Sequence, residues 1–217
     1  MILRRPEDAF CLYVLAHGAG AGMRHRFLEA LADALAAGGV ATLRYEFQYV
    51  EEGRRRIDPA PVLHARVREA VAAAGKEGLP LFAGGKSMGG RMTSQAQALE
   101  PLPGVRGLAF AGFPLHPAGK PGTERAAHLR EVRVPMLFLQ GTRDSLADLS
   151  LLRPVVEGLA NATLHVIDDA DHSFHVRKSS GRTDAEVVRE LARTFAQWAQ
   201  RTIGESSSRE SRSDGSR

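Results

Sequence analysis

Short apolar runs alternate along the chain with segments whose apolar residues recur at helical spacing. The runs expected to form strands are residues 10–16, 40–45, 79–83, 105–111, 135–140 and 162–167. They are apolar nearly throughout, as strands are when helices cover both faces of their sheet. Strands that alternate with helical segments indicate an α/β fold with a mostly parallel sheet.

The segments between the runs predict helices. Phe27, Leu31 and Leu35 recur at four-residue spacing, which places them on one helix face, and Gly38-Gly39 ends that helix. Residues 46–60 are expected to form a charged loop. Further helices are expected at 61–74, from near Gly89, Thr123 and Asp148, and at 184–201, where Val187, Leu191, Phe195 and Trp198 form an apolar stripe.

The last 13 residues differ from the rest of the chain. The segment 205–217 contains no large apolar side chain, so it cannot bury enough surface to offset the entropy lost on ordering. We therefore expect one domain over residues 1–204 and a disordered tail over residues 205–217.

Composition and charge exclude several classes of protein. The 43% hydrophobic and 25% charged residues exclude a wholly disordered chain and a coiled coil. No apolar run reaches the roughly 18 residues of a membrane span, so we expect no membrane partner. The net charge is only +4, and the basic residues are scattered, so we expect no nucleic-acid partner. We expect the dense run Arg54–Arg56 to lie in a solvated loop, and contact with an anionic substrate is the alternative.

The N-terminal residues and the cysteine content bear on the compartment. An acidic pair interrupts the N-terminal residues where a secretion signal has its apolar stretch, and Cys11 is the single cysteine. One cysteine cannot form an internal disulfide, and a reducing compartment is the simple interpretation. We therefore expect a cytoplasmic protein.

The strongest motif is Gly-Lys-Ser-Met-Gly at residues 85–89, which follows an apolar run and precedes a helical segment. This is the context of a G-x-S-x-G nucleophile elbow, a sharp strained turn that lifts the serine hydroxyl clear of the sheet. Gly85 and Gly89 stand where a Cβ would clash with neighbouring backbone. The motif predicts Ser87 as a nucleophile, with an ordinary strand-to-helix turn as the alternative.

Gly85-Lys86-Ser87 also ends like a phosphate-binding loop, G-x-x-x-x-G-K-[ST]. That loop requires its first glycine five positions before the second, and Pro80 occupies that position. The loop would also have to include Leu81 and Phe82, which are expected to be buried. The nucleotide-binding interpretation is therefore disfavoured.

A serine hydroxyl needs a base to become a good nucleophile. Asp144 and His172 each follow an apolar run, so both are expected at the carboxyl edge of the sheet together with Ser87. Asp148 could replace Asp144, although it better suits a helix N-cap. His175 could replace His172, although it lies further into its loop. We expect Ser87, Asp144 and His172 to meet.

The segment His17-Gly18-Ala19-Gly20 follows the first apolar run. Small residues allow a substrate carbonyl to approach the backbone at this position. Where a serine elbow is present, an oxyanion hole forms from the N–H after the nucleophile and an N–H of this loop. That assigns the backbone amides of Ala19 and Met88, and leaves His17 as a residue that shapes the loop.

These pieces, in this order, resemble the α/β-hydrolase superfamily over roughly residues 10–200. More narrowly, HGAGAGM, GGKSMGGRM, GFPLHPAGK, LQGTRD and DADHSFHV are similar to small lidless bacterial proteins of the dienelactone-hydrolase-like kind. The resemblance implies an α/β-hydrolase fold with six or seven strands, helices on both faces and no cap domain. It also implies a serine hydrolase of small carboxylic esters or thioesters, with Ser87 as nucleophile, Asp144 as acid and His172 as base. Dienelactone hydrolases proper use cysteine where Ser87 stands, so their substrate is not carried over.

The segment that usually holds a lid is short. Only about 23 residues separate the runs 105–111 and 135–140, so we expect an open cleft and a small-molecule acyl substrate. Residues expected at the pocket are Phe113, Leu115, His116 and Tyr49, with packing in the core or in a turn as the alternative for each. We expect neither a metal nor a cofactor. A non-catalytic interaction protein that keeps the hydrolase fold is the alternative function.

Overall fold

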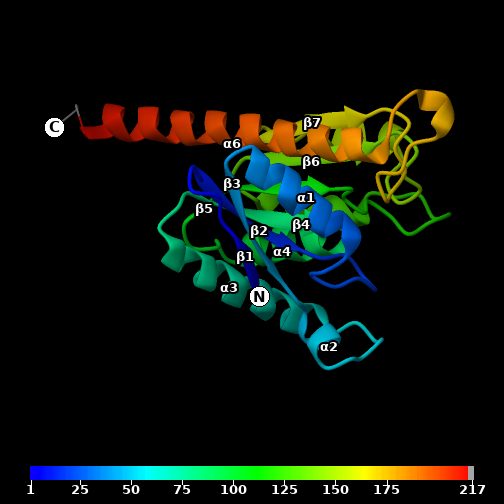
Figure 1. Ribbon diagram of the computed structural model, residues 1–217, viewed down its shortest axis with the longest axis horizontal. Coiled ribbons are helices and arrows are strands. Elements are labelled where there is room, and N and C mark those ends of the chain that lie inside the picture. The colour runs from blue at the N-terminus through cyan, green and yellow to red at the C-terminus, as the bar shows by residue number, and fades with distance from the viewer. Residues whose placement is uncertain (215–217) are drawn as a thin grey trace.

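A computed structural model of the chain describes the backbone of residues 1–214 and the side chains of residues 1–205 (Figure 1). The strands are β1 (Ile2–Arg4), β2 (Cys11–Ala16), β3 (Val40–Tyr45), β4 (Leu81–Lys86), β5 (Val105–Ala111), β6 (Met136–Gly141) and β7 (Ala162–Ile167). The α-helices are α1 (Arg26–Ala37), α2 (Gln48–Glu51), α3 (Ala60–Ala74), α4 (Met88–Leu99), α5 (Leu149–Glu157) and α6 (Asp184–Asp214). Short 3₁₀ segments are η1 (Gly75–Glu77), η2 (Glu124–Glu131) and η3 (Lys178–Ser180).

The seven strands form one sheet in the order β1-β3-β2-β4-β5-β6-β7. All neighbours pair in parallel except β1, which lies antiparallel to β3 at the edge. The order reverses direction at β2, from which the chain goes first to β3 and later to β4. The expected α/β-hydrolase fold class is confirmed, and the described residues include no inserted cap domain.

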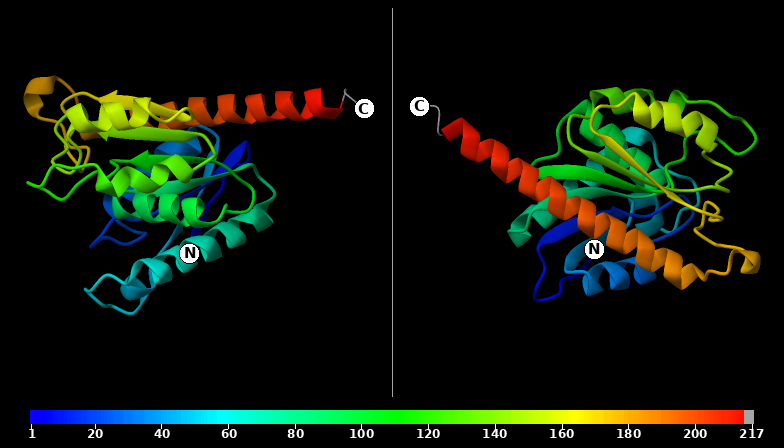
Figure 2. Two further views of the ribbon diagram at one scale, coloured as in Figure 1. Left: turned by 180° about the vertical axis from the view of Figure 1, so that it is seen from behind. Right: turned by 90° about the horizontal axis from the view of Figure 1, so that it is seen from above.

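Helices cover both faces of the sheet, and alternate side chains of each strand enter two different cores. From β2, Val14 packs with α3 and α4 residues, whereas Tyr13 packs with residues of α1 and α6. Figure 2 shows α6 crossing one face of the sheet. The apolar stripe predicted on the last helix packs in the core between the sheet and α1 and α6, where Phe195 contacts both Tyr13 and Trp198. Burial on both faces explains why the strands read as continuous apolar runs.

Three elements differ from the sequence expectation. The strand β1 precedes the first predicted strand and pairs Leu3 with Leu43. The helix α2 lies within residues 46–60, which were expected to be a loop. The helix α6 extends to Asp214, beyond the expected end at Arg201. Residues 215–217, and the side chains from residue 206 onward, lie outside the described residues, so the disordered tail expected at 205–217 stays a prediction.

The carboxyl ends of β4, β6 and β7 lie along the same edge of the sheet, because β4 to β7 all run parallel to one another. Each is followed directly by a segment that carries one of the expected site residues. Within the described part of the chain, no helix is both long and apolar enough to cross a bilayer.

Candidate active site

Ser87 occupies the sharp turn between β4 and α4. Its backbone has φ 51° and ψ −118°, a region that non-glycine residues rarely adopt. The turn passes very close to β2. A Cβ on Gly85 would lie 2.4 Å from the Ala16 carbonyl oxygen, and one on Gly89 would lie 2.5 Å from that of His17. Glycine at both positions therefore permits the turn that exposes the Ser87 hydroxyl.

Ser87, His172 and Asp144 form a continuous hydrogen-bonded chain. The Oγ of Ser87 lies 2.8 Å from Nε2 of His172, and Nδ1 of His172 lies 2.7 Å from Oδ2 of Asp144. The carboxylate can only accept, so Nδ1 of the neutral imidazole carries the proton. Nε2 then accepts from the Ser87 hydroxyl, which is the direction that general-base activation requires.

The Asp144 carboxylate is held by three donors. Oδ2 accepts from the Gln140 side-chain amide at 2.5 Å as well as from His172, and Oδ1 accepts from the Leu146 amide at 2.8 Å. The Asp144 side chain has no exposed surface, whereas 23% of the His172 side chain is exposed. The buried carboxylate therefore fixes the imidazole while the other ring nitrogen, Nε2, contacts the Ser87 hydroxyl.

The loop after β2 is shaped by the buried His17. Its Nδ1 lies 2.8 Å from the Gly18 carbonyl oxygen, and its Nε2 accepts from the Phe47 amide at 3.1 Å. Burial lowers the pKa of His17, which fits a neutral ring with one donor and one acceptor nitrogen. His17 thus connects the loop to the segment after β3, in agreement with the expected structural role.

The two amides assigned to an oxyanion hole remain available. Met88 is the first residue of α4, so its N–H has no partner within the helix. Among the described residues, no hydrogen bond uses the amide of Ala19 or Met88. Gly18 brings the Ala19 loop beside the nucleophile, because a Cβ on Gly18 would lie 3.5 Å from Cβ of Ser87.

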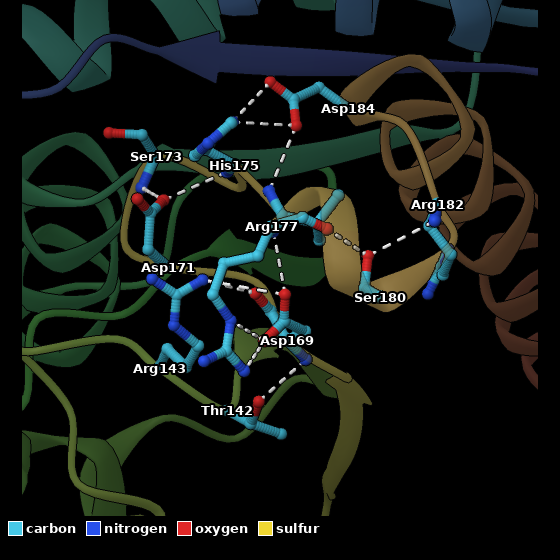
Figure 3. Close-up of polar contacts among 11 residues, drawn as sticks. Thr142, Arg143, Asp169, Asp171, Ser173, His175, Arg177, Ser180, Arg182 and Asp184 are labelled. Atoms are coloured by element: carbon cyan, nitrogen blue, oxygen red, sulfur yellow. Dashed lines mark hydrogen bonds and ion pairs between the residues drawn. The ribbon is translucent and has the colours of Figure 1, made fainter.

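The loop that carries His172 is tied down on both sides of the histidine. Figure 3 shows Asp169 among Thr142, Arg143 and Arg177, and the Asp169 side chain accepts from the Arg177 amide at 2.8 Å and from its Nε at 2.7 Å. The Arg177 guanidinium holds the pKa of Asp169 below its usual range. Together these contacts anchor the loop to the turn after β6, beside Asp144.

The second tie is Asp171, next to the histidine. Its Oδ1 accepts from the amides of Ser173 at 2.7 Å and His175 at 3.0 Å. The positive φ angles of Asp169 (55°) and Phe174 (63°) flank the same segment. Apart from Ser87, these are the only described non-glycine residues with positive φ, so backbone strain is concentrated around the three-residue chain.

The alternative acid and base lie elsewhere. Asp148 caps α5 by accepting from the Ser150 amide at 2.8 Å, as its position before a helix predicted. His175 is exposed and pairs with Asp184 at 2.9 Å, and this carboxylate raises the pKa of His175. Neither residue belongs to the hydrogen-bonded chain that ends at Ser87.

The residues expected at a pocket are buried. Phe113 and Leu115 have no exposed surface, Tyr49 is 2% exposed, and all three belong to the core under α3 and α4. The Nε2 of His116 accepts from the Asp148 amide at 3.0 Å, which anchors the turn before α5. These are the surroundings of packing and turn residues, the alternative that the sequence left open.

Two other sequence features are placed by the structure. Residues 81–86 form the buried strand β4, so they cannot form the phosphate-binding loop that Lys86-Ser87 resembled. The run Arg54–Arg56 is exposed after α2, where Arg54 pairs with Glu52 and Asp58.

Sequence reasoning missed two residues around the site. Gln140 contacts Asp144, and Gly112 flanks the chain from Asp144 to His172; the only signal for them was their position at strand ends. The arrangement provides a hydroxyl, a base oriented by a buried carboxylate, and two free amides. These are the parts needed for acyl transfer through a serine.

Comparisons with known proteins agree with this fold. A family model described as "Alpha/beta hydrolase domain" matches residues 10–200. Among solved structures, a dienelactone hydrolase from Anabaena variabilis is 20% identical with a TM-score of 0.69, over 92% of this chain and 89% of the other. An alpha-beta serine hydrolase homologue from Coxiella burnetii is 22% identical with a TM-score of 0.69, over 89% of each chain. The esterase domain of a Rhodothermus marinus protein is 17% identical with a TM-score of 0.68, over 92% and 91%.

Proposed function

Because this chain belongs to the alpha/beta hydrolase domain family, whose model spans residues 10–200, we propose that it is a serine hydrolase. Its reaction is the hydrolysis of a small carboxylic ester or thioester through an acyl-enzyme on Ser87. The observation that carries the proposal is the hydrogen-bonded chain from Asp144 through His172 to the strained Ser87. The names of the similar structures, an esterase domain and a dienelactone hydrolase, support an ester bond as the target.

In the first step, the Ser87 oxygen attacks the acyl carbonyl carbon while Nε2 of His172 takes the hydroxyl proton. The carbonyl oxygen becomes an oxyanion and accepts hydrogen bonds from the amides of Ala19 and Met88. Asp144 accepts from Nδ1 and stabilises the positive charge that forms on the ring. The C–O or C–S bond then breaks, and His172 gives its proton to the leaving alcohol or thiol.

In the second step, a water molecule attacks the acyl carbon of the acyl-enzyme. His172 takes a proton from the water, and a second oxyanion forms between the same two amides. The bond to Ser87 then breaks, the serine oxygen recovers the proton from His172, and the carboxylic acid leaves. The described residues contain no lid that would have to open before a substrate binds. Ser87 and His172 both retain exposed surface, which favours a small or protruding acyl group.

A fluorophosphonate probe tests the nucleophile. Wild-type protein is expected to be labelled, whereas Ser87→Ala is not, and Ser94→Ala serves as the matched control because Ser94 also contacts a histidine. A series of p-nitrophenyl esters of increasing acyl length then defines the substrate class, with the shortest esters cleaved fastest. Labelling that survives Ser87→Ala, or an ester response that is flat and unchanged by this substitution, would refute the proposal and favour a non-catalytic interaction protein.

A further inference from the structure

Lys86 lies beside the candidate site, although no step of the proposed mechanism uses it. It is the last residue of β4, it pairs with Ala111 of β5, and it directly precedes Ser87. Its side chain reaches toward the loop after β7, where Nζ lies 5.6 Å from the centroid of the Phe174 ring. Phe174 in turn stacks on Phe27 of α1, with 5.4 Å between the ring centroids.

Gly112 shows how close the lysine is to the hydrogen-bonded chain. A Cβ on Gly112 would lie 3.2 Å from Nζ of Lys86, 3.4 Å from Oδ2 of Asp144 and 3.5 Å from Cε1 of His172. A single point beside the glycine is therefore in contact distance of all three groups. The glycine, which has φ +68°, leaves the space in which the ammonium approaches the carboxylate.

Two carboxylates act on this ammonium from different elements. Asp144 follows β6 and Asp171 belongs to the loop after β7, and both raise the pKa of Lys86, although burial outweighs them and lowers it to about 8. The other neighbours are the titratable ring of His172, the uncharged ring of Phe174, and Gly112 at the end of β5. Among the described residues, no carboxylate oxygen lies within 4 Å of Nζ, so the lysine acts on both carboxylates without a direct ion pair.

We propose that Lys86 is a positioning residue, whose ammonium holds Asp144 and Asp171 toward one corner and thereby fixes the His172 loop against the ends of β5 and β6. Asp144 orients the imidazole directly, and Asp171 shapes the turn that presents it. The ammonium lies beside the Asp144 carboxylate, and both carboxylates favour its charged form. The inference rests on the proposed serine hydrolase function and assigns a role to the lysine of the Gly-Lys-Ser-Met-Gly motif.

The test measures kcat and KM for p-nitrophenyl acetate between pH 6 and 10 in wild-type protein, Lys86→Met and Lys86→Arg. Wild-type kcat is expected to fall as Lys86 loses its proton near pH 8. Lys86→Met keeps the length of the side chain without the charge, so kcat at pH 7 is expected to be about tenfold lower, with KM within twofold and no fall near pH 8. Lys86→Arg retains the charge, so its plateau is expected to extend above pH 9. Lys76→Met, at an exposed lysine, is expected to match wild type.

A Lys86→Met profile that keeps the wild-type fall near pH 8, or a kcat equal to that of wild type, overturns the role of Lys86. If Lys86→Met does not fold, as checked by thermal unfolding, the rate of fluorophosphonate labelling of wild-type protein against pH still decides. A labelling rate that stays flat from pH 7 to 9.5 overturns the inference while leaving the serine hydrolase intact. Wild-type protein that is never labelled overturns the proposed function itself.

Discussion

The chain contains two serine–histidine pairs with the same separation. The Ser87 Oγ to His172 Nε2 distance is 2.8 Å, and so is the distance from Ser94 Oγ to His128 Nε2. The two serines lie on the same strand-to-helix segment, Ser87 at the turn before α4 and Ser94 within that helix. A short contact alone therefore does not distinguish a candidate nucleophile from a structural pair.

The direction of the hydrogen bond separates the two pairs. The Ser87 hydroxyl donates to His172, because the other ring nitrogen, Nδ1, keeps its proton and donates a hydrogen bond to Asp144. The Ser94 hydroxyl instead donates to the Arg91 carbonyl oxygen at 2.9 Å. Its only proton is then used, and His128 must act as the donor, so Ser94 has no base.

The surroundings differ in charge as well. A carboxylate lies behind His172, whereas the groups that act electrostatically on His128 are the Arg91 guanidinium and the ring of His64. Burial, followed by Arg91 and by His64 where it is protonated, lowers the pKa of His128 to about 4, which leaves a weakly basic ring. The difference teaches that the acid and the strained turn, rather than the serine–histidine contact, distinguish the candidate nucleophile Ser87 from Ser94.

Asp144→Asn is the largest expected change, because it converts the first pair into one that resembles the second. An amide at this position can donate to Nδ1, which favours the wrong tautomer of His172. We expect kcat to fall by about 10⁴ in the p-nitrophenyl acetate assay. Asp148→Asn is the matched control, since asparagine also caps helices well, and it is expected to leave kcat within twofold. Equal effects of the two substitutions would contradict the assignment of Asp144.

Gly89→Ala tests the turn that Ser87 has and Ser94 lacks. The added Cβ would lie 2.5 Å from the His17 carbonyl oxygen, so the elbow and the Ala19 loop must move apart. We expect a loss of about 2 kcal/mol in the free energy of unfolding and a fall of about 10² in labelling rate.

Gly75→Ala is the control for Gly89→Ala. Gly75 ends α3 with helical φ −59° and ψ −23°, and nothing lies within 4 Å of its added Cβ. This substitution is expected to stabilise the protein by about 0.5 kcal/mol and to leave labelling unchanged. A Gly89→Ala protein that is as stable and as reactive as Gly75→Ala would contradict the tight elbow.

His128→Asn produces the smallest expected effect, and it appears only in acid. The pKa of His128 is lowered in the folded protein, so the unfolded chain binds the proton first as the pH falls from about 6.5 toward 4. Wild-type stability is therefore lost over this window, and His128→Asn is expected to lose less. Urea midpoints at pH 7.5 and 5 measure the difference.

His175→Asn is expected to change the pH dependence of stability in the opposite direction. The pKa of His175 is raised by Asp184, so the stability that this pair contributes is present at low pH. It is lost as the pH rises through the pKa that His175 has in the folded protein. An identical pH dependence of His128→Asn and wild type would contradict the lowered pKa of the half-buried His128.

Much of this architecture could be predicted from the sequence, because burial on both faces gives β2, β4, β5 and β6 continuous apolar runs. The order of Ser87, Asp144 and His172 at strand ends also followed from the pattern. The edge strand β1 could not be predicted, because its three residues are largely exposed and its pairing with β3 spans about 40 positions. The approach of Lys86 to Asp144 and the neighbours of His128 depend on contacts between distant segments, for which the chain carries no local signal.

Peptide mapping after fluorophosphonate labelling tests the central claim most directly. Trypsin cleaves after Lys86, Arg91 and Arg106, so Ser87 and Ser94 fall on separate peptides, 87–91 and 92–106. The account predicts the phosphonyl adduct on peptide 87–91 of wild-type protein, and its loss in Asp144→Asn within the same labelling time. An adduct on peptide 92–106, or intact protein that carries no adduct after prolonged labelling, would contradict it.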